Sequence, residues 1–149
     1  MLLNTKHFGE IEIDEDKAIT FQEGLHGFED IKKYIIILNT DKDIPFHWLQ
    51  AVEEPDLAFV ITNPFQFKED YVFDIQDKVI EQLEIQDKED VAIFSIAVVP
   101  EKLENLTINL RAPLIINVEK RKGRQFVLDG DEYSLKHYIF QSAATSEIG

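Results

Sequence analysis

The amino-acid sequence predicts a mainly β protein, a single-domain, barrel-like antiparallel β structure with one short helix at about residues 77–85. Three observations support this prediction. About ten short apolar or alternating runs are separated by Gly, Pro, Asn and Asp residues, which is typical of an all-β domain. Only one stretch changes to helical spacing. The chain has 149 residues, the size of one domain, and no linker or repeat divides it.

The centre of the predicted core is a hairpin at residues 45–65, which includes the single Trp, Trp48. Phe46 and Trp48 point to one face of its first strand, and Leu49 points to the other. Residues 57–62 are almost continuously apolar, as expected of a strand that is covered on both faces. The Glu-Glu-Pro-Asp stretch between the strands has turn chemistry, and an Asn-Pro pair ends the second strand.

The other predicted strands are short runs, and most of them alternate or are continuously apolar. In chain order they lie at residues 1–6, 7–13, 18–21, 34–38, 71–75, 91–99, 106–111, 114–118 and 125–128, with a last apolar segment at 133–140. Gly9 is expected to mark a bulge. Gly24 and Gly27 are expected to supply positive φ in a turn. The run at 106–111 is expected to pair with the run at 91–99.

The predicted helix depends on the spacing of three apolar residues. Val79, Ile80 and Leu83 fall on one face of a short helix, and acidic residues occupy positions outside that face. Asp74 or Asp77 is expected to cap its start. We expect one β-barrel domain at 1–140, followed by a flexible C-terminal tail at 141–149 that is small and polar.

The charge of the chain restricts its function classes. It has 15 Lys and Arg against 29 Asp and Glu, a net charge of −14, and no Cys. Such a surface repels phosphate backbones and attracts basic partners, although solubility alone can also explain the charge. No apolar run approaches the roughly 18 residues of a membrane span, and no signal-peptide pattern is present. We therefore expect a cytoplasmic protein that contacts neither membrane nor nucleic acid directly.

The sequence contains no recognisable constellation of catalytic residues. The four histidines (His7, His26, His47 and His137) are scattered, without the spacing of a zinc site. Ser95 lies within a predicted buried strand, and no Ser has the context of an activated nucleophile. The sequence therefore predicts a protein that is not an enzyme and has no cofactor or metal.

Two charged stretches are candidate contact surfaces. Residues 69–90 contain nine Asp and Glu but only Lys78 and Lys88, so they form either a docking site for a basic protein or a solvated surface. Residues 119–124 form a basic hairpin tip. That tip is either a contact for a second partner or an edge device that blocks aggregation, and the second interpretation is favoured.

Several stretches together resemble the FliW family of bacterial flagellar assembly factors, in order and spacing over nearly the whole chain. They are Phe21 with GLHGFE at 24–29, PFHWLQAV at 45–52, LAFV at 57–60, NPF at 63–65, YVFDI at 71–75, NLRAPLIIN at 109–117, GRQFVL at 123–128, and Tyr133. His26 departs from the family, which usually has Pro there. Local rigidity is expected to differ, because Pro restricts the backbone.

The resemblance implies a small, barrel-like, non-enzymatic cytoplasmic protein that switches between two partners. FliW-like proteins bind CsrA, a basic RNA-binding translational repressor, and so relieve the repression of flagellin mRNA. They also bind flagellin, which captures the factor until flagellin is secreted. An acidic surface suits a basic regulator, and a chain without catalytic motifs suits a binding protein.

The motifs of the family do not identify the contact residues, so we select candidates by chemistry. The predicted partner-binding residues are an acidic rim and aromatic anchors, namely Glu69, Asp70, Asp74, Glu81 and Glu84 with Phe65, Phe67 and Tyr71. Two other classes remain as alternatives. One is an oligonucleotide-binding small β-barrel, which the net charge disfavours. The other is a hydrolase or metal enzyme on a barrel, for which no ligand set is found.

Overall fold

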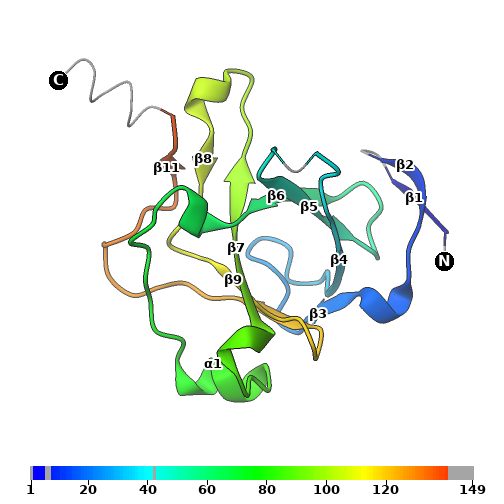
Figure 1. The fold of residues 1–149 in the computed structure, drawn as a ribbon. Coiled ribbons are helices and arrows are strands. Elements are labelled where there is room, and N and C mark those ends of the chain that lie inside the picture. The colour runs from blue at the N-terminus through cyan, green and yellow to red at the C-terminus, as the bar shows by residue number, and fades with distance from the viewer. Residues whose placement is uncertain (1, 6–7, 42, 141–149) are drawn as a thin grey trace.

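The structure is a computed structural model that describes residues 2–5, 8–41 and 43–140 (Figure 1). The predicted tail at 141–149 lies outside the described residues. The strands are β1 (Leu2–Thr5), β2 (Gly9–Glu12), β3 (Ile19–Phe21), β4 (Lys33–Ile37), β5 (Phe46–Ala51), β6 (Ala58–Thr62), β7 (Val91–Val98), β8 (Thr107–Ile108), β9 (Leu114–Asn117), β10 (Lys122–Gln125) and β11 (His137–Tyr138). The helices are α1 (Asp77–Gln82) and the 3₁₀ helices η1 (Glu15–Lys17), η2 (Pro64–Gln66), η3 (Lys88–Asp90) and η4 (Leu103–Asn105).

Seven of the described strands close into a barrel, in the order β7–β6–β5–β4–β3–β10–β9 and back to β7. Every neighbouring pair in it is antiparallel except β3 and β10, which run parallel with Phe21 opposite Gly123. β8 and β11 extend the sheet beyond β7, and β1 pairs with β2 in a separate hairpin. The predicted mainly β, barrel-like fold with one short helix is confirmed.

The barrel interior contains the main core, and the β5–β6 hairpin supplies its centre as predicted. Leu49 and Ala51 of β5 are fully buried there, while Trp48 contacts Phe8 edge-on on the outer face, with ring centroids 5.2 Å apart. Strand alternation explains this division. The interior is completed by Ile19, Phe21, Leu25, Tyr34, Ile61, Leu114 and Ile116.

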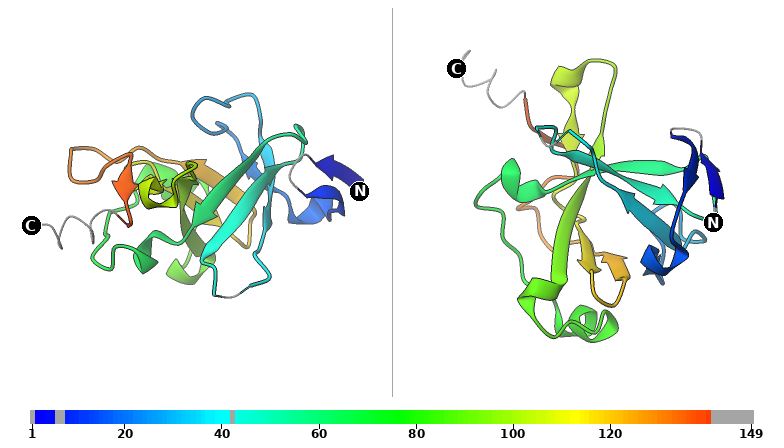
Figure 2. Two further views of the ribbon diagram at one scale, coloured as in Figure 1. Left: turned by 90° about the horizontal axis from the view of Figure 1, so that it is seen from above. Right: turned by 45° about the vertical axis from the view of Figure 1, so that its right-hand side comes forward.

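Two further layers cover opposite sides of the barrel (Figures 1 and 2). On one side, the β1–β2 hairpin and the chain after it bury Leu3 and Ile13 against Ile35 of β4. On the other side, β8, β11 and the long connections at 63–76 and 126–136 cover β6 and β7. This second layer builds the surface described below.

Helix α1 packs on the outer wall of the barrel through the face that the sequence predicts. Val79 and Leu83 are buried against Ile115 of β9. The predicted caps are wrong, because Gln76 occupies the N-cap position and makes no side-chain capping bond. The helix ends at Gln82 rather than near residue 85, since Glu84 adopts a φ of +54° that a helix cannot continue.

Several predicted strands are shorter than expected or form no strand. Residues 71–75 form no strand and belong to no β-ladder. Of 106–111, only β8 forms a strand. The Asn109 amide still donates to the Ile96 carbonyl of β7, and the chain then bends where the Asn109 side chain accepts from the amides of Arg111 and Ala112. Of 133–140, only β11 forms a strand. β10 begins at Lys122, inside the predicted basic tip and before the predicted strand at 125–128.

The turn at 24–28 contains the two glycines that the sequence predicts in positive φ. Gly24 has a φ of +67° and Gly27 a φ of +88°. A Cβ at Gly24 would also lie 2.6 Å from the main chain of Glu29, so no other residue fits. The His26 amide donates to Gln125 Oε1 at 2.9 Å, a bond that a Pro at this position cannot make. No helix among the described residues is long and apolar enough to cross a membrane.

Candidate partner-binding surface

The connection from β6 to α1 crosses the outer wall of the barrel and contains most of the predicted site residues. Asn63 begins it as an N-cap, because its side chain accepts from the amide of Phe65 at 3.0 Å. Phe65 is then exposed to 41%. Phe67 is only half-buried and stacks on Phe46, with ring centroids 5.8 Å apart. Phe65 is therefore the more accessible of these two predicted aromatic anchors.

Tyr71 anchors this connection from below the surface. Its side chain is buried, and its hydroxyl donates to the carbonyl of Leu110 at 2.6 Å. Burial, with a smaller contribution from Tyr133, raises the pKa of the Tyr71 phenol. The two rings contact edge-on, with centroids 4.7 Å apart. Tyr71 thus shapes the surface but offers no exposed ring to a partner.

Substitution of Tyr71 by Phe is expected to lower the free energy of unfolding by about 1–3 kcal/mol, because it leaves the buried Leu110 carbonyl without its donor. Urea denaturation followed by Trp fluorescence measures this change. Tyr138→Phe is the matched control, since that ring is 40% exposed and its loss of a hydroxyl is expected to cost less than about 0.5 kcal/mol. Equal midpoints for the two variants would contradict the role of Tyr71.

An apolar groove lies between this connection and the start of β7. Its volume is about 540 Å³. One wall is the connection itself, and the other is formed by α1 and the chain that leads through η3 into β7. The lining includes Phe65, Val72, Phe73, Ile75, Ile85 and Val91. A concave apolar surface of this size accommodates several side chains of a partner.

A second cleft lies on the other flank of residues 72–76, with a volume of about 410 Å³. Here Asp129 and Glu132 join Asp74 at the rim, while Phe126 and Tyr133 belong to the lining. Asp129 and Glu132 are not among the residues that the sequence predicts for the site, because no local pattern indicates that a segment more than fifty residues later lies beside Asp74. The fold alone brings these carboxylates together.

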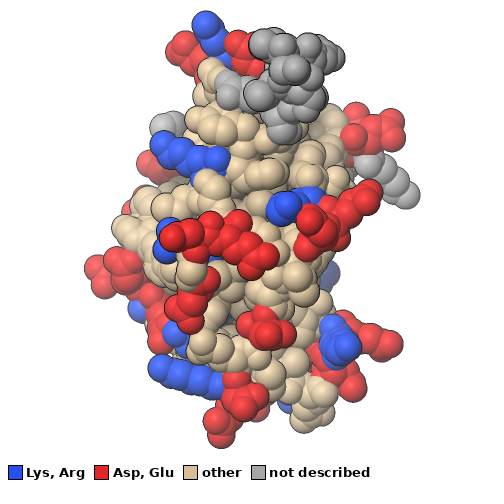
Figure 3. Space-filling view, turned by 90° about the vertical axis from the view of Figure 1, so that its left-hand side faces the viewer, with Lys and Arg blue, Asp and Glu red and all other residues tan. Residues whose placement is uncertain are grey.

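The predicted acidic rim is present on the surface, but two of its members already have cationic partners. Asp70 pairs with Lys68 at 3.0 Å, and Glu84 pairs with Lys122 at 2.5 Å. Hydrogen bonds from these lysines lower the pKa of both carboxyls. Glu69, Asp74 and Glu81 are exposed and form no ion pair with another described residue. On the side of the molecule shown in Figure 3, acidic side chains cover more of the surface than basic ones.

Two of the basic side chains in and beside the tip, Lys122 and Arg124, form ion pairs within the protein. Lys122 pairs with Glu84, and Arg124 pairs with Glu23 at 3.2 Å while it donates to Gln82 Oε1. Lys120 and Arg121 remain exposed in the turn. The hairpin therefore presents a smaller positive surface than its sequence indicates, which weakens the interpretation of the tip as a partner contact.

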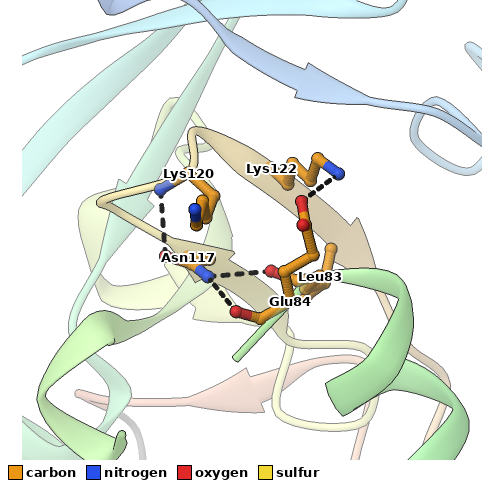
Figure 4. A network of polar contacts seen from close by, with 5 residues as sticks. All are labelled: Leu83, Glu84, Asn117, Lys120 and Lys122. Atoms are coloured by element: carbon orange, nitrogen blue, oxygen red, sulfur yellow. Dashed lines mark hydrogen bonds and ion pairs between the residues drawn. The ribbon is translucent and has the colours of Figure 1, made fainter. Parts of the chain in front are cut away.

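Asn117 at the end of β9 joins this turn to the end of α1 (Figure 4). Its side chain is buried, and its Nδ2 donates to the carbonyls of Leu83 and Glu84 at 2.8 and 3.1 Å. Its Oδ1 accepts from the amides of Glu119 and Lys120, each at 3.1 Å. One side chain thus fixes the position of α1 on the barrel, and with it one wall of the groove.

No group of three or more His, Cys, Asp or Glu within the described ranges has the arrangement of a metal site. The surface offers contacts of two kinds, apolar side chains in the groove and exposed carboxylates on the segments that form it. Such a combination suits the binding of a partner protein with apolar and basic side chains.

Comparison with known proteins identifies the family. The model of the FliW protein family matches residues 2–139. The chain is 54% identical over 141 residues to the flagellar assembly factor FliW of Alkaliphilus metalliredigens, covering 95% of this chain and 87% of that protein. It is 46% identical over 148 residues to that of Ruminiclostridium cellulolyticum, covering 99% and 100%.

A solved structure agrees with these sequence matches. A crystal structure described as that of the flagellar assembly factor FliW superposes with a TM-score of 0.87 and 37% identity, covering 94% of this chain and 97% of that one. The resemblance that the sequence motifs indicate is thereby confirmed. The chain belongs to the FliW family.

Proposed function

We propose that this protein is a cytoplasmic flagellar assembly factor that works by binding protein partners in turn. In this proposal it captures the translational repressor CsrA, which relieves the repression of flagellin mRNA, and it releases CsrA when flagellin binds. Membership of the family supports the flagellar role, because the matched relatives are named flagellar assembly factors. The partner switch extends the resemblance described above.

The observation that best supports binding of a basic partner is that the acidic rim lies on the same segments of the chain that line the apolar groove. Glu69, Asp74 and Glu81 are exposed and unpaired among the described residues, and the apolar groove lies beside the same connection. Carboxylates at the rim of an interface steer a cationic partner and accelerate association, while apolar contacts hold the complex.

Titration calorimetry with purified CsrA, repeated after saturation with flagellin, tests the proposal directly. Binding of CsrA that flagellin abolishes is the expected result. Absence of binding to both proteins would overturn the proposed function. Simultaneous binding of CsrA and flagellin would support both proposed partners but contradict the proposed switch between them.

A charge-reversal variant tests whether the acidic rim steers CsrA. Glu69→Lys with Asp70→Lys is expected to slow association about tenfold at low salt and to flatten its dependence on ionic strength. The control is Glu15→Lys with Asp16→Lys in η1, which changes the net charge equally at an exposed site that is distant in sequence. Stopped-flow kinetics measures both. An equal effect of the two variants would show that net charge, not this rim, controls association.

A further inference from the structure

Residues 72–76 form an unpaired segment that lies outside the described strands. Their side chains alternate as in a strand: Phe73 and Ile75 turn toward the body of the protein, while Val72, Asp74 and Gln76 are exposed. The exposed fraction of Val72 is 68%. No β-ladder includes these residues, although the alternation of side chains is that of a half-buried strand.

The middle residues of this segment have main-chain groups without hydrogen-bond partners in the described part of the protein. Among the residues that the structure describes, none hydrogen-bonds to the N–H or C=O groups of Phe73, Asp74 and Ile75. Main-chain N–H and C=O groups in proteins are nearly always hydrogen-bonded, to the protein, to a partner or to water, so these groups are available to an incoming partner. An extended segment with free donors and acceptors is a template for another strand.

Tyr133 indicates which edge of the segment is open. Its hydroxyl accepts from the Val72 amide and donates to the Val72 carbonyl, both at 3.0 Å. In an extended strand, both main-chain groups of one residue point to one edge, and those of the next residue point to the other. Phe73 and Ile75 therefore present their main-chain groups away from Tyr133. Both residues also line the apolar groove.

We propose that residues 72–76 bind an extended segment of a partner protein by β-strand addition, with the added strand lying in the apolar groove. This inference rests on the proposed partner-binding function and specifies its mode. The partner segment would alternate apolar residues of about the size of Val with Lys or Arg. Its apolar side chains fill the groove, and its cations face the carboxylates of Asp74 and Asp87.

Charge and hydrogen bonding together favour this occupant over a helix. A helix satisfies its own main chain and would leave the donors and acceptors of Phe73 and Ile75 unpaired, whereas a strand bonds to them directly. The groove lining contains one Lys, Lys88, and one Asp, Asp87. Asp74 does not line this groove, but its exposed carboxylate lies on the same segment and has no ion pair among the described residues, so it can pair with a cation of a neighbouring strand. A cationic strand therefore meets complementary charge.

The test uses a synthetic nine-residue peptide of alternating Lys and Val, with blocked ends, and the full-length protein labelled with ¹⁵N. NMR titration is expected to shift the Phe73 and Ile75 amides and to slow their hydrogen exchange at least tenfold. A Glu–Val peptide of the same length is the charge control and is expected to bind at least tenfold more weakly. Shifts confined to other residues would overturn the proposal.

Backbone methylation of the peptide separates strand addition from a loose apolar contact. The N–H groups of alternate residues in a strand point to opposite edges. N-methylation of one alternating set is therefore expected to weaken binding at least tenfold, and methylation of the other set to change it less than threefold. Equal effects of both sets would reject strand pairing. This measurement requires no change in the protein, so folding of a variant does not affect it.

A final comparison distinguishes this inference from the proposed function. Complexes with CsrA and with flagellin are measured by hydrogen exchange at the same two amides. Protection of Phe73 and Ile75 in at least one complex is expected. If both proteins bind without protecting these amides, the binding mode is rejected while the proposed function stands. If neither binds but the Lys–Val peptide does, the site stands and the proposed partners are rejected.

Discussion

Substitution of Asn117 by Ala is expected to lower the free energy of unfolding by about 2–4 kcal/mol, a large fraction of the stability of a domain this size. The reason is that one buried amide makes four hydrogen bonds to main-chain groups at the end of α1 and in the β9–β10 turn. Urea denaturation followed by fluorescence of the single Trp measures the change. Exposed Asn4 in β1 provides the control, and Asn4→Ala is expected to stay within about 0.5 kcal/mol of the unsubstituted protein.

The Asn117→Asp variant adds a dependence on pH whose direction follows from the same contacts. An ionised carboxylate keeps the two bonds from Glu119 and Lys120 but faces the carbonyls of Leu83 and Glu84. This repulsion raises the pKa of the new carboxyl in the folded state. The protonated form can donate, so its stabilising contribution is present below the unfolded pKa of about 3.9 and is lost as pH rises through the folded pKa. A stability deficit that does not grow with pH would contradict this geometry.

Substitution of Gly123 by Ala is expected to destabilise the barrel by about 1–3 kcal/mol or more through overpacking. Gly123 lies on β10 opposite Phe21 of β3, and a Cβ there would lie 2.6 and 2.7 Å from two atoms of the Phe21 ring. That ring is fully buried and contacts Tyr34 edge-on at 5.5 Å, so it has no space into which it can move. Denaturation of the purified variant measures the loss.

A double-mutant cycle identifies the cause of that loss. Phe21→Leu removes the ring edge, so Gly123→Ala is expected to cost less in its presence, with a coupling of about 0.5–3 kcal/mol. Gly27→Ala is the control, because Gly27 has positive φ but open space around its Cβ position. Its cost comes from the backbone and is expected to add to that of Phe21→Leu without coupling. Additivity for Gly123 as well would reject the steric explanation.

The sequence predicts those features that depend on local chemistry. The hairpin around Trp48 follows from apolar runs and a turn between them, and the face of α1 follows from the spacing of Val79 and Leu83. Both are confirmed because hydrophobic alternation determines which side of an element is buried. Hydrophobic alternation does not indicate whether a segment has a partner strand. The sequence therefore predicts a strand at 71–75, although these residues belong to no β-ladder.

The parts of the candidate surface that the sequence does not reveal all depend on contacts between distant residues. Asp129 reaches the cleft beside Asp74 through the path of a long connection. Lys122 neutralises Glu84, which no local rule indicates. The sequence predicts Tyr71 as an aromatic anchor for a partner, but its side chain is buried and its hydroxyl donates to the carbonyl of Leu110. The composition predicts that the surface charge is negative, but the fold determines which carboxylates remain available to a partner protein.

The parallel pairing of β3 with β10 has a consequence for the order in which the chain can fold during synthesis. Most barrel pairs join strands that are close in sequence, but this seam joins residues about a hundred positions apart. A nascent chain can form β4, β5 and β6 early, while β3 retains an open edge. This edge stays unpaired until β10 has emerged from the ribosome. Unfinished chains therefore expose a strand edge for most of their synthesis, and only the nearly complete polypeptide closes it.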